Sequence, residues 1–230
     1  MHDTYCYHHK NYHMNKHGFF QDIKNWKVKH KTNNCAILYF KHNQEFYDIF
    51  PFLFTIEITL RLIKFKLSYQ VKIINNDLKK IYFSFGFHPA FKLNNFKQSY
   101  IKTNLKSFLF EVVANNKIVQ FSKQKYKKIN LKNLNFESGQ TYLIKNKIKK
   151  ITFINQDYKL KLSWITCQYF LIWTKSKKDH FLCLEPWSGF LDNKQCENLN
   201  IDQKPGIITL EPNRIKNFSL TLKWYDYTIQ

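Results

Sequence analysis

The sequence of 230 residues predicts an all-β protein, built as an antiparallel sandwich or barrel. Three observations predict this fold class. Apolar and polar residues alternate one by one over long stretches, which is typical of half-buried antiparallel strands. No long window shows the 3.6-residue period of an amphipathic helix. Turn-forming residues separate the alternating stretches, as expected for many strands at short spacing.

Each alternating stretch defines one strand with a buried face. Every second residue is apolar in 52–60, 63–73, 81–87, 158–164 and 218–224. The stretch from 123 to 135 is rich in Lys and Asn and is expected to be a loop or an edge strand. No change of composition marks a linker, so the sequence predicts one domain over residues 1–230. Turn signals lie at 75–77, 94–95, 115–116, 138–139 and 204–206.

The charge is strongly positive, with 37 Lys and Arg against 16 Asp and Glu. Only Arg61 and Arg214 are arginines, although a nucleic-acid surface favours the planar arginine fork. Lysines are spread along the whole chain, and the abundance of Lys, Asn, Ile, Phe and Tyr indicates an AT-rich coding sequence. We therefore interpret most lysines as solvated, with selection for an anionic partner as the alternative.

The cellular compartment is predicted from what the sequence lacks. The five cysteines include no C-x-x-C pair, and residues 1–17 contain no apolar stretch of the kind found in a signal peptide. No uncharged apolar run reaches the length of about 18 residues that a membrane helix needs. We expect reduced thiols, a cytoplasmic location and no membrane partner.

Three short segments hold three of the five glycines and differ in composition from the Lys-, Asn- and Phe-rich remainder of the chain: residues 12–22, 85–91 and 181–189. His88 follows a predicted strand and is fixed by Pro89, so its imidazole could move a proton near neutral pH. Glu185 ends an apolar run, where a carboxylate tends to have a perturbed pKa that suits a general base. His17 precedes Gly18, which could expose its ring. For each of the three, a purely structural role is the alternative.

A metal site is not predicted. His9, His13 and His17 lie four residues apart and would share one face of a helix, but the aromatic residues around them do not indicate a helix. No H-E-x-x-H pattern is present. The nucleophile-elbow, P-loop and dinucleotide-binding motifs are also absent.

Taken together, these segments resemble the aldose 1-epimerase (mutarotase) superfamily, in the branch associated with bacterial lactose operons. The most specific matches are HPAF, at 88–91, and CLEPWSG, at 183–189. The family's HGF segment corresponds to 17–19, and joint occurrence in the family's order makes chance unlikely. The further matching segments are 4–16, 50–60, 171–174 and 206–224.

The resemblance implies a large antiparallel β-sandwich with a sugar cleft, an activity that interconverts the α and β anomers of aldoses, and no cofactor. It implies that Glu185 is the base, that His88 is the acid, and that His17 is a second histidine at the sugar. Trp187 is expected to line the cleft and Asp192 to bind a hydroxyl, with structural roles as the alternative for both.

Two departures from the family pattern matter. Gln21 stands where the family has an arginine, which favours a free hexose over a phosphosugar and leaves Gln21 as a candidate sugar contact. The family's first strands have no counterpart before Met1, so the resemblance predicts an N-terminally shortened sandwich. The predicted function is an aldose 1-epimerase, with a degenerate carbohydrate-binding remnant as the alternative. A nucleic-acid partner is not expected, because the aromatic residues follow the strand alternation of a core.

Overall fold

The computed structural model describes residues 4–105, 108–114, 117–124, 128–136, 140–144, 148–189 and 199–226. These residues form antiparallel strands and short 3-10 helices, and no α-helix occurs among them. The predicted all-β class is therefore confirmed, as is the antiparallel β-sandwich. The 3-10 helices are η1 (Phe20–Asp22), η2 (Gln44–Phe46), η3 (Leu131–Asn133) and η6 (Ile201–Gln203).

Contacts between Cα atoms divide the chain into two compact units. The first unit comprises Met1–Ile63, Ser68–Ser84 and Leu191–Ser219. The second comprises Lys64–Leu67, Phe85–Phe190 and Leu220–Gln230. The prediction of one domain over residues 1–230 stays a prediction.

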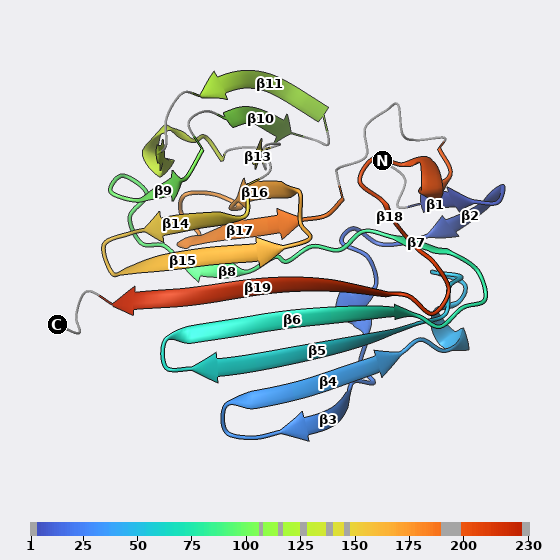
Figure 1. Cartoon of the computed structure of the whole chain (residues 1–230). Coiled ribbons are helices and arrows are strands. Elements are labelled where there is room, and N and C mark those ends of the chain that lie inside the picture. The colour runs from blue at the N-terminus through green and yellow to red at the C-terminus, as the bar shows by residue number, and fades with distance from the viewer. Residues whose placement is uncertain are drawn as a thin grey trace. The chain divides into compact units, whose positions relative to one another are not determined.

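The first unit is built on a sheet with the strand order β19-β6-β5-β4-β3, visible in Figure 1. Its members are β3 (Lys27–Lys31), β4 (Cys35–Lys41), β5 (Phe54–Ile63), β6 (Lys66–Asn75) and the start of β19 (Ile215–Asp226). On β5, the buried residues Phe54, Ile56 and Ile58 alternate with partly exposed ones, as predicted. Two small antiparallel pairs complete the unit: β1 (Thr4–Tyr7) with β2 (Lys10–His13), and β7 (Ile81–Phe83) with β18 (Ile208–Leu210).

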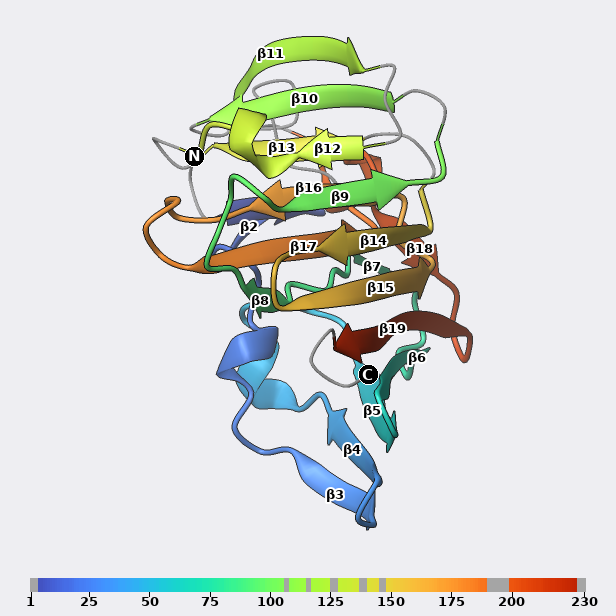
Figure 2. The same cartoon turned by 90° about the vertical axis from the view of Figure 1, so that its left-hand side faces the viewer.

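The second unit contains a six-stranded sheet with the order β11-β10-β13-β16-β17-β8. Its other sheet has the order β12-β9-β14-β15-β19, and Figure 2 shows β9, β14 and β15 side by side. The six-stranded sheet comprises β8 (Ala90–Lys92), β10 (Phe108–Ala114), β11 (Lys117–Gln124), β13 (Thr141–Ile144), β16 (Tyr169–Trp173) and β17 (Phe181–Trp187). The other adds β9 (Tyr100–Thr103), β12 (Lys128–Asn130), β14 (Lys150–Ile154), β15 (Tyr158–Ile165) and the end of β19.

The two sheets of the second unit pack face to face. The rings of Trp164 on β15 and Phe170 on β16 stack at 5.1 Å between centroids, and both side chains are buried. This contact shows which face of β16 points into the sandwich. The strand β12 lies at the edge of its sheet, which confirms one of the two readings of residues 123–135.

Two predicted strands are shorter than the alternation suggested. Ile63 and Phe65 are more than half exposed, because Lys64 and Phe65 form a turn in which Lys64 has a φ of 50°. The strand predicted over 81–87 ends at Phe83. The chain beyond it is irregular, and Gly86 forms an isolated bridge to Trp187. The predicted turns at 115–116 and 138–139 lie outside the described residues.

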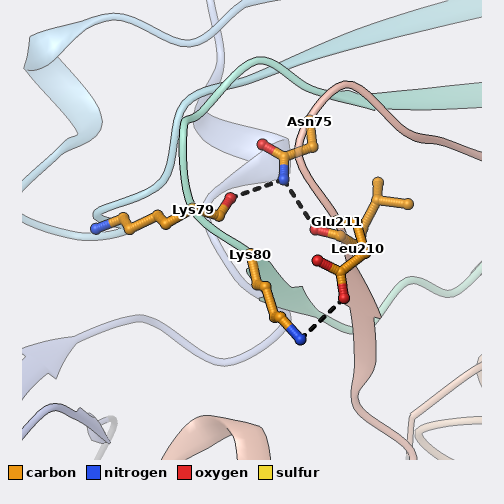
Figure 3. Close-up of polar contacts among 5 residues, drawn as sticks. All are labelled: Asn75, Lys79, Lys80, Leu210 and Glu211. Carbon is orange, nitrogen blue, oxygen red and sulfur yellow. Dashed lines mark hydrogen bonds and ion pairs between the residues drawn. The ribbon is translucent and has the colours of Figure 1, made fainter.

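A turn predicted at 75–77 contains a fully buried asparagine. The Asn75 amide nitrogen donates to the carbonyl oxygens of Lys79, at 2.9 Å, and Leu210, at 2.8 Å (Figure 3). Its oxygen accepts a hydrogen bond of 2.8 Å from the backbone nitrogen of Asp77. Figure 3 also shows the exposed ion pair between Lys80 and Glu211 nearby. Asn75 thus joins the end of β6 to β18 through side-chain hydrogen bonds to backbone groups of the turn and of β18.

We expect Asn75→Asp to lower the free energy of unfolding by about 3 kcal/mol, because an ionised carboxylate cannot donate to two carbonyl oxygens. Denaturant unfolding measures this change. Asn25→Asp is the matched control, since Asn25 is exposed and its change should stay within about 0.5 kcal/mol. Equal losses in both variants would contradict the role assigned to Asn75.

His42 is a buried histidine in the aromatic core of the first unit, with its ring centroid 5.0 Å from that of Phe54. Burial lowers its pKa, and the backbone near Phe46 and the charge of Asp77 offset this only in part. The folded chain therefore binds this proton less readily than the unfolded chain. Below the ordinary histidine value of about 6.5, the unfolded chain is protonated first and the fold loses stability.

We expect His42→Leu to reduce the slope of the free energy of unfolding against pH below pH 6.5. The reduction should be up to about 1.4 kcal/mol per pH unit, the value for one proton. Denaturant unfolding at several pH values from 7.5 to about 5 measures the slope. His30→Leu is the control, because His30 lies exposed on β3. An unchanged slope in His42→Leu would show that other groups dominate the acid sensitivity.

Candidate active site

The strand β17 divides its side chains between the sandwich interior and the opposite face. Phe170 on β16, which stacks on Trp164 in the sandwich interior, stands opposite Pro186 on β17. The face of β17 that carries Pro186 therefore also points into the interior. Side chains two residues apart in a strand share a face, and their neighbours point the other way. Cys183, Glu185 and Trp187 consequently lie together on the face that points away from that interior.

The segment that carries His88 is fastened along β17 by backbone hydrogen bonds. Phe87 N donates to Pro186 O at 3.0 Å, and Leu184 N donates to Pro89 O at 3.2 Å. These two bonds flank His88 on either side. Further along, Ser188 and Phe85 exchange two hydrogen bonds of 2.8 Å, one of them through the Ser188 hydroxyl. The position of His88 is thus set by the strand that carries Glu185.

His88 and Glu185 form an acid–base pair. Their atoms Nε2 and Oε1 lie 3.4 Å apart. The carboxylate side chain is only 2% exposed, whereas the imidazole is 37% exposed. A buried carboxylate next to an accessible imidazole can share a proton with it while the imidazole remains open to a bound molecule. The structure thus brings together the two residues expected to be base and acid.

Cys183 lies beside this pair and is 2% exposed. Its Sγ lies within 4.8 Å of ligand atoms from both His88 and Glu185. Burial raises the pKa of the Cys183 thiol to about 12, and the charge of Glu185 adds to the rise. The thiol is therefore protonated at neutral pH and is a poor nucleophile.

Two indole rings flank His88. The ring of Trp173 meets the imidazole edge-on, with 6.1 Å between centroids, and the ring of Trp187 lies at 6.5 Å. Both tryptophans are partly exposed. Aromatic walls around a few polar groups are typical of small-molecule sites. Trp187 therefore stands close to the pair, and its role in lining a sugar cleft stays a prediction.

Gly86 allows Trp187 to reach this position. A Cβ atom at Gly86 would lie 2.5 Å from Cδ1 and 2.9 Å from Cγ of Trp187, closer than any real contact. Only glycine lets the backbone at this point lie against the indole ring.

The other predicted site residues belong elsewhere in the chain. His17 and Gln21 are part of the first unit and are exposed. His17 has a φ of 70° in a turn closed by a hydrogen bond from Gly18 N to Asn15 O, and Gln21 lies in η1. Their roles stay predictions. Asp192 lies outside the described residues.

Sequence reasoning assigned no role to Cys183 or Trp173. Cys183 could have been found, because it precedes Glu185 by two residues and so shares its face of a strand. Trp173 could not have been found in this way. It reaches the site because it stands opposite Cys183 in the pairing of β16 with β17, a register that alternation alone does not reveal.

Comparison with known proteins places the chain in a family. The family described as aldose 1-epimerase matches residues 2–223, so the chain belongs to the aldose 1-epimerase family. None of the curated proteins compared with the chain matches it. The family implies a sugar as the substrate.

Solved structures agree with this fold. A galactose mutarotase related enzyme from Lactobacillus acidophilus has a TM-score of 0.87 at 20% identity, over 99% of this chain and 80% of its own. A galactose mutarotase-like protein from Lactobacillus casei has a TM-score of 0.82 at 24% identity, over 97% and 80%. A protein from Synechocystis has a TM-score of 0.78 at 22% identity, over 98% and 74%. The chain is similar to all three in fold.

Among the described residues, no helix is long and apolar enough to cross a membrane. The cysteines that the structure describes, Cys6, Cys35, Cys167 and Cys183, are all free thiols.

We expect Gly86→Ala to lower the free energy of unfolding by about 1–3 kcal/mol, because the indole ring of Trp187 must move away from the added methyl group. Removing the ring in Trp187→Leu should relieve this cost, so the double variant should be more stable than the sum of the single changes predicts. Denaturant unfolding of the four proteins measures the coupling. Strict additivity would contradict the contact.

Proposed function

We propose that the chain is an aldose 1-epimerase that interconverts the α and β anomers of a hexose by acid–base ring opening. Glu185 takes the proton of the C1 hydroxyl, and protonated His88 gives its proton to the ring oxygen O5. The C1–O5 bond breaks as the C1 carbonyl forms. After rotation about C1–C2, the reverse proton transfers close the ring on the other face, so no proton is gained or lost overall.

The observation that carries this proposal is the distance of 3.4 Å between His88 Nε2 and Glu185 Oε1. The two oxygens that exchange protons in ring opening are bonded to the same carbon. An acid and a base that serve both oxygens must therefore lie next to each other. The pair has this spacing, and its imidazole is open to a ligand.

The finer features of the proposal follow the family resemblance. We propose that His17 assists at the sugar, that Trp187 lines the site, and that Asp192 and Gln21 contact hydroxyl groups. Gln21 in place of a basic residue favours a free hexose over a phosphosugar. A cytoplasmic location, the lactose-operon branch and one domain over the whole chain belong to the same proposal. The free thiols support the location.

The test is polarimetry of freshly dissolved α-D-glucose, and then of α-D-galactose, with and without the protein. We expect Glu185→Gln and His88→Asn each to slow catalysed mutarotation by about 10²–10⁴-fold, because each removes one proton-transfer group. Circular dichroism checks that both variants keep the β-fold.

The wild-type rate should also follow a bell-shaped pH profile, as expected when one acid and one base both act. The control is Lys92→Gln, on the neighbouring strand β8, which should leave the rate unchanged. Wild-type protein that is folded and yet inactive would overturn the proposal, and would favour a carbohydrate-binding remnant of the same fold.

A further inference from the structure

The acid–base pair and the neighbouring thiol together have the composition of a metal site. His88, Cys183 and Glu185 bring an imidazole nitrogen, a sulfur and a carboxylate oxygen within 4.8 Å of one another. Within the described ranges, this is the one group of three metal-binding side chains gathered so closely. We propose that these three residues bind a Zn²⁺ ion, and that the bound ion blocks the acid–base pair.

The distances suit tetrahedral zinc. Nitrogen and oxygen ligands at about 2.0–2.1 Å from a tetrahedral ion lie about 3.4 Å from each other. The atoms His88 Nε2 and Glu185 Oε1 already have this separation of 3.4 Å. With a Zn–S bond of about 2.3 Å, the sulfur must come to about 3.6 Å from the other two ligands. Cys183 Sγ starts within 4.8 Å of them, so a small side-chain rotation completes the set.

The donor types select the ion. A thiolate and an imidazole favour zinc over Mg²⁺ or Ca²⁺, which prefer oxygen ligands alone. Three protein ligands leave the fourth position of a tetrahedral ion open to water, as in catalytic zinc sites. Among the three protein ligands, His88 approaches the ion from the exposed side, whereas Cys183 and Glu185 are buried.

The backbone holds the three ligands in place before any ion binds. Cys183 and Glu185 are two residues apart on β17, and both lie in the part of this strand, from Cys183 to Trp187, that pairs with β16. Cys183 also pairs with Ala90 on β8, and His88 lies just before that strand. A site arranged in advance loses little conformational entropy on binding.

Binding requires the loss of the thiol proton of Cys183 and, when His88 is protonated, of the imidazolium proton at Nε2, which also passes to the solvent. The thiol S–H bond breaks, the S–Zn bond forms, and the proton passes to the solvent. The carboxylate of Glu185 favours the protonated thiol, whereas a dication at this point favours the thiolate. A thiol that coordinates zinc is deprotonated outright. The ion also takes the lone pair of His88 Nε2 and the oxygen of Glu185, so neither group can exchange a proton with a sugar. This inhibition rests on the proposed function, whereas the binding of zinc does not.

Cobalt absorption tests the site directly, because a thiolate ligand gives Co²⁺ a charge-transfer band that nitrogen and oxygen ligands do not give. The full chain, freed of metal with a chelator that is then removed, is titrated with CoCl₂ and displaced with ZnCl₂. We expect one thiolate-bound Co²⁺ per chain. Cys183→Ser should abolish the band and weaken zinc binding at least tenfold, as measured by calorimetry.

Cys167→Ser is the matched control. Cys167 is also buried, its pKa is also raised to about 12, and it lies outside the group of three. It should keep the band and the zinc affinity of the wild type. His88→Asn supplies a second test at an exposed position, where the fold should be kept, and it should also weaken zinc binding at least tenfold. Absence of the band in the wild type, or its persistence in Cys183→Ser, would overturn the proposal.

A separate measurement distinguishes this proposal from the proposed function. Zinc should inhibit wild-type mutarotation, and a chelator should restore it. Protein that binds zinc through Cys183 but has no mutarotation without zinc would support the metal site and refute the epimerase. Protein that is active and unaffected by saturating zinc would refute the inhibition.

Discussion

The candidate active site depends on how closely the chain before β8 approaches β17. Gly86 lies directly against the indole ring of Trp187, and hydrogen bonds from Phe87 and to Pro89 fix the residues on either side of His88. The hydrogen bonds join backbone groups, and the contact of Gly86 is with an uncharged ring, so neither depends on the charge of His88 or Glu185. Without them, an imidazole on an irregular segment would have no defined distance to a carboxylate in a strand.

The difference in exposure between His88 and Glu185 is a second constraint. A buried carboxylate is costly unless it is paired and hydrogen-bonded, and the strand places an imidazole within reach. The imidazole remains open because its flanking rings, Trp173 and Trp187, stand beside it. The carboxylate is thereby kept out of water while the imidazole remains accessible, which is the division that the proposed acid–base chemistry uses.

The sequence predicted the fold class well because alternation is a local property. The strands β5 and β15 could be read residue by residue, whereas Ile63 and Phe65 continue the alternation into a turn and are exposed. The roles of His88 and Glu185 were expected from a family resemblance, whereas their contact at 3.4 Å comes from the structure. The contribution of Trp173 depends on the register of two strands, which is set by the whole sheet.

The two halves of the acid–base pair differ in the kind of backbone that supports them. Glu185 belongs to an interior strand of the six-stranded sheet, where a shift of one residue would turn every side chain to the other face. His88 belongs to an irregular segment next to a strand of only three residues. The segment around His88 can therefore be lengthened or redirected while Glu185 stays in place. For the proposed epimerase, changes in this segment would alter the sugar contacts on the imidazole side without rebuilding the sheet.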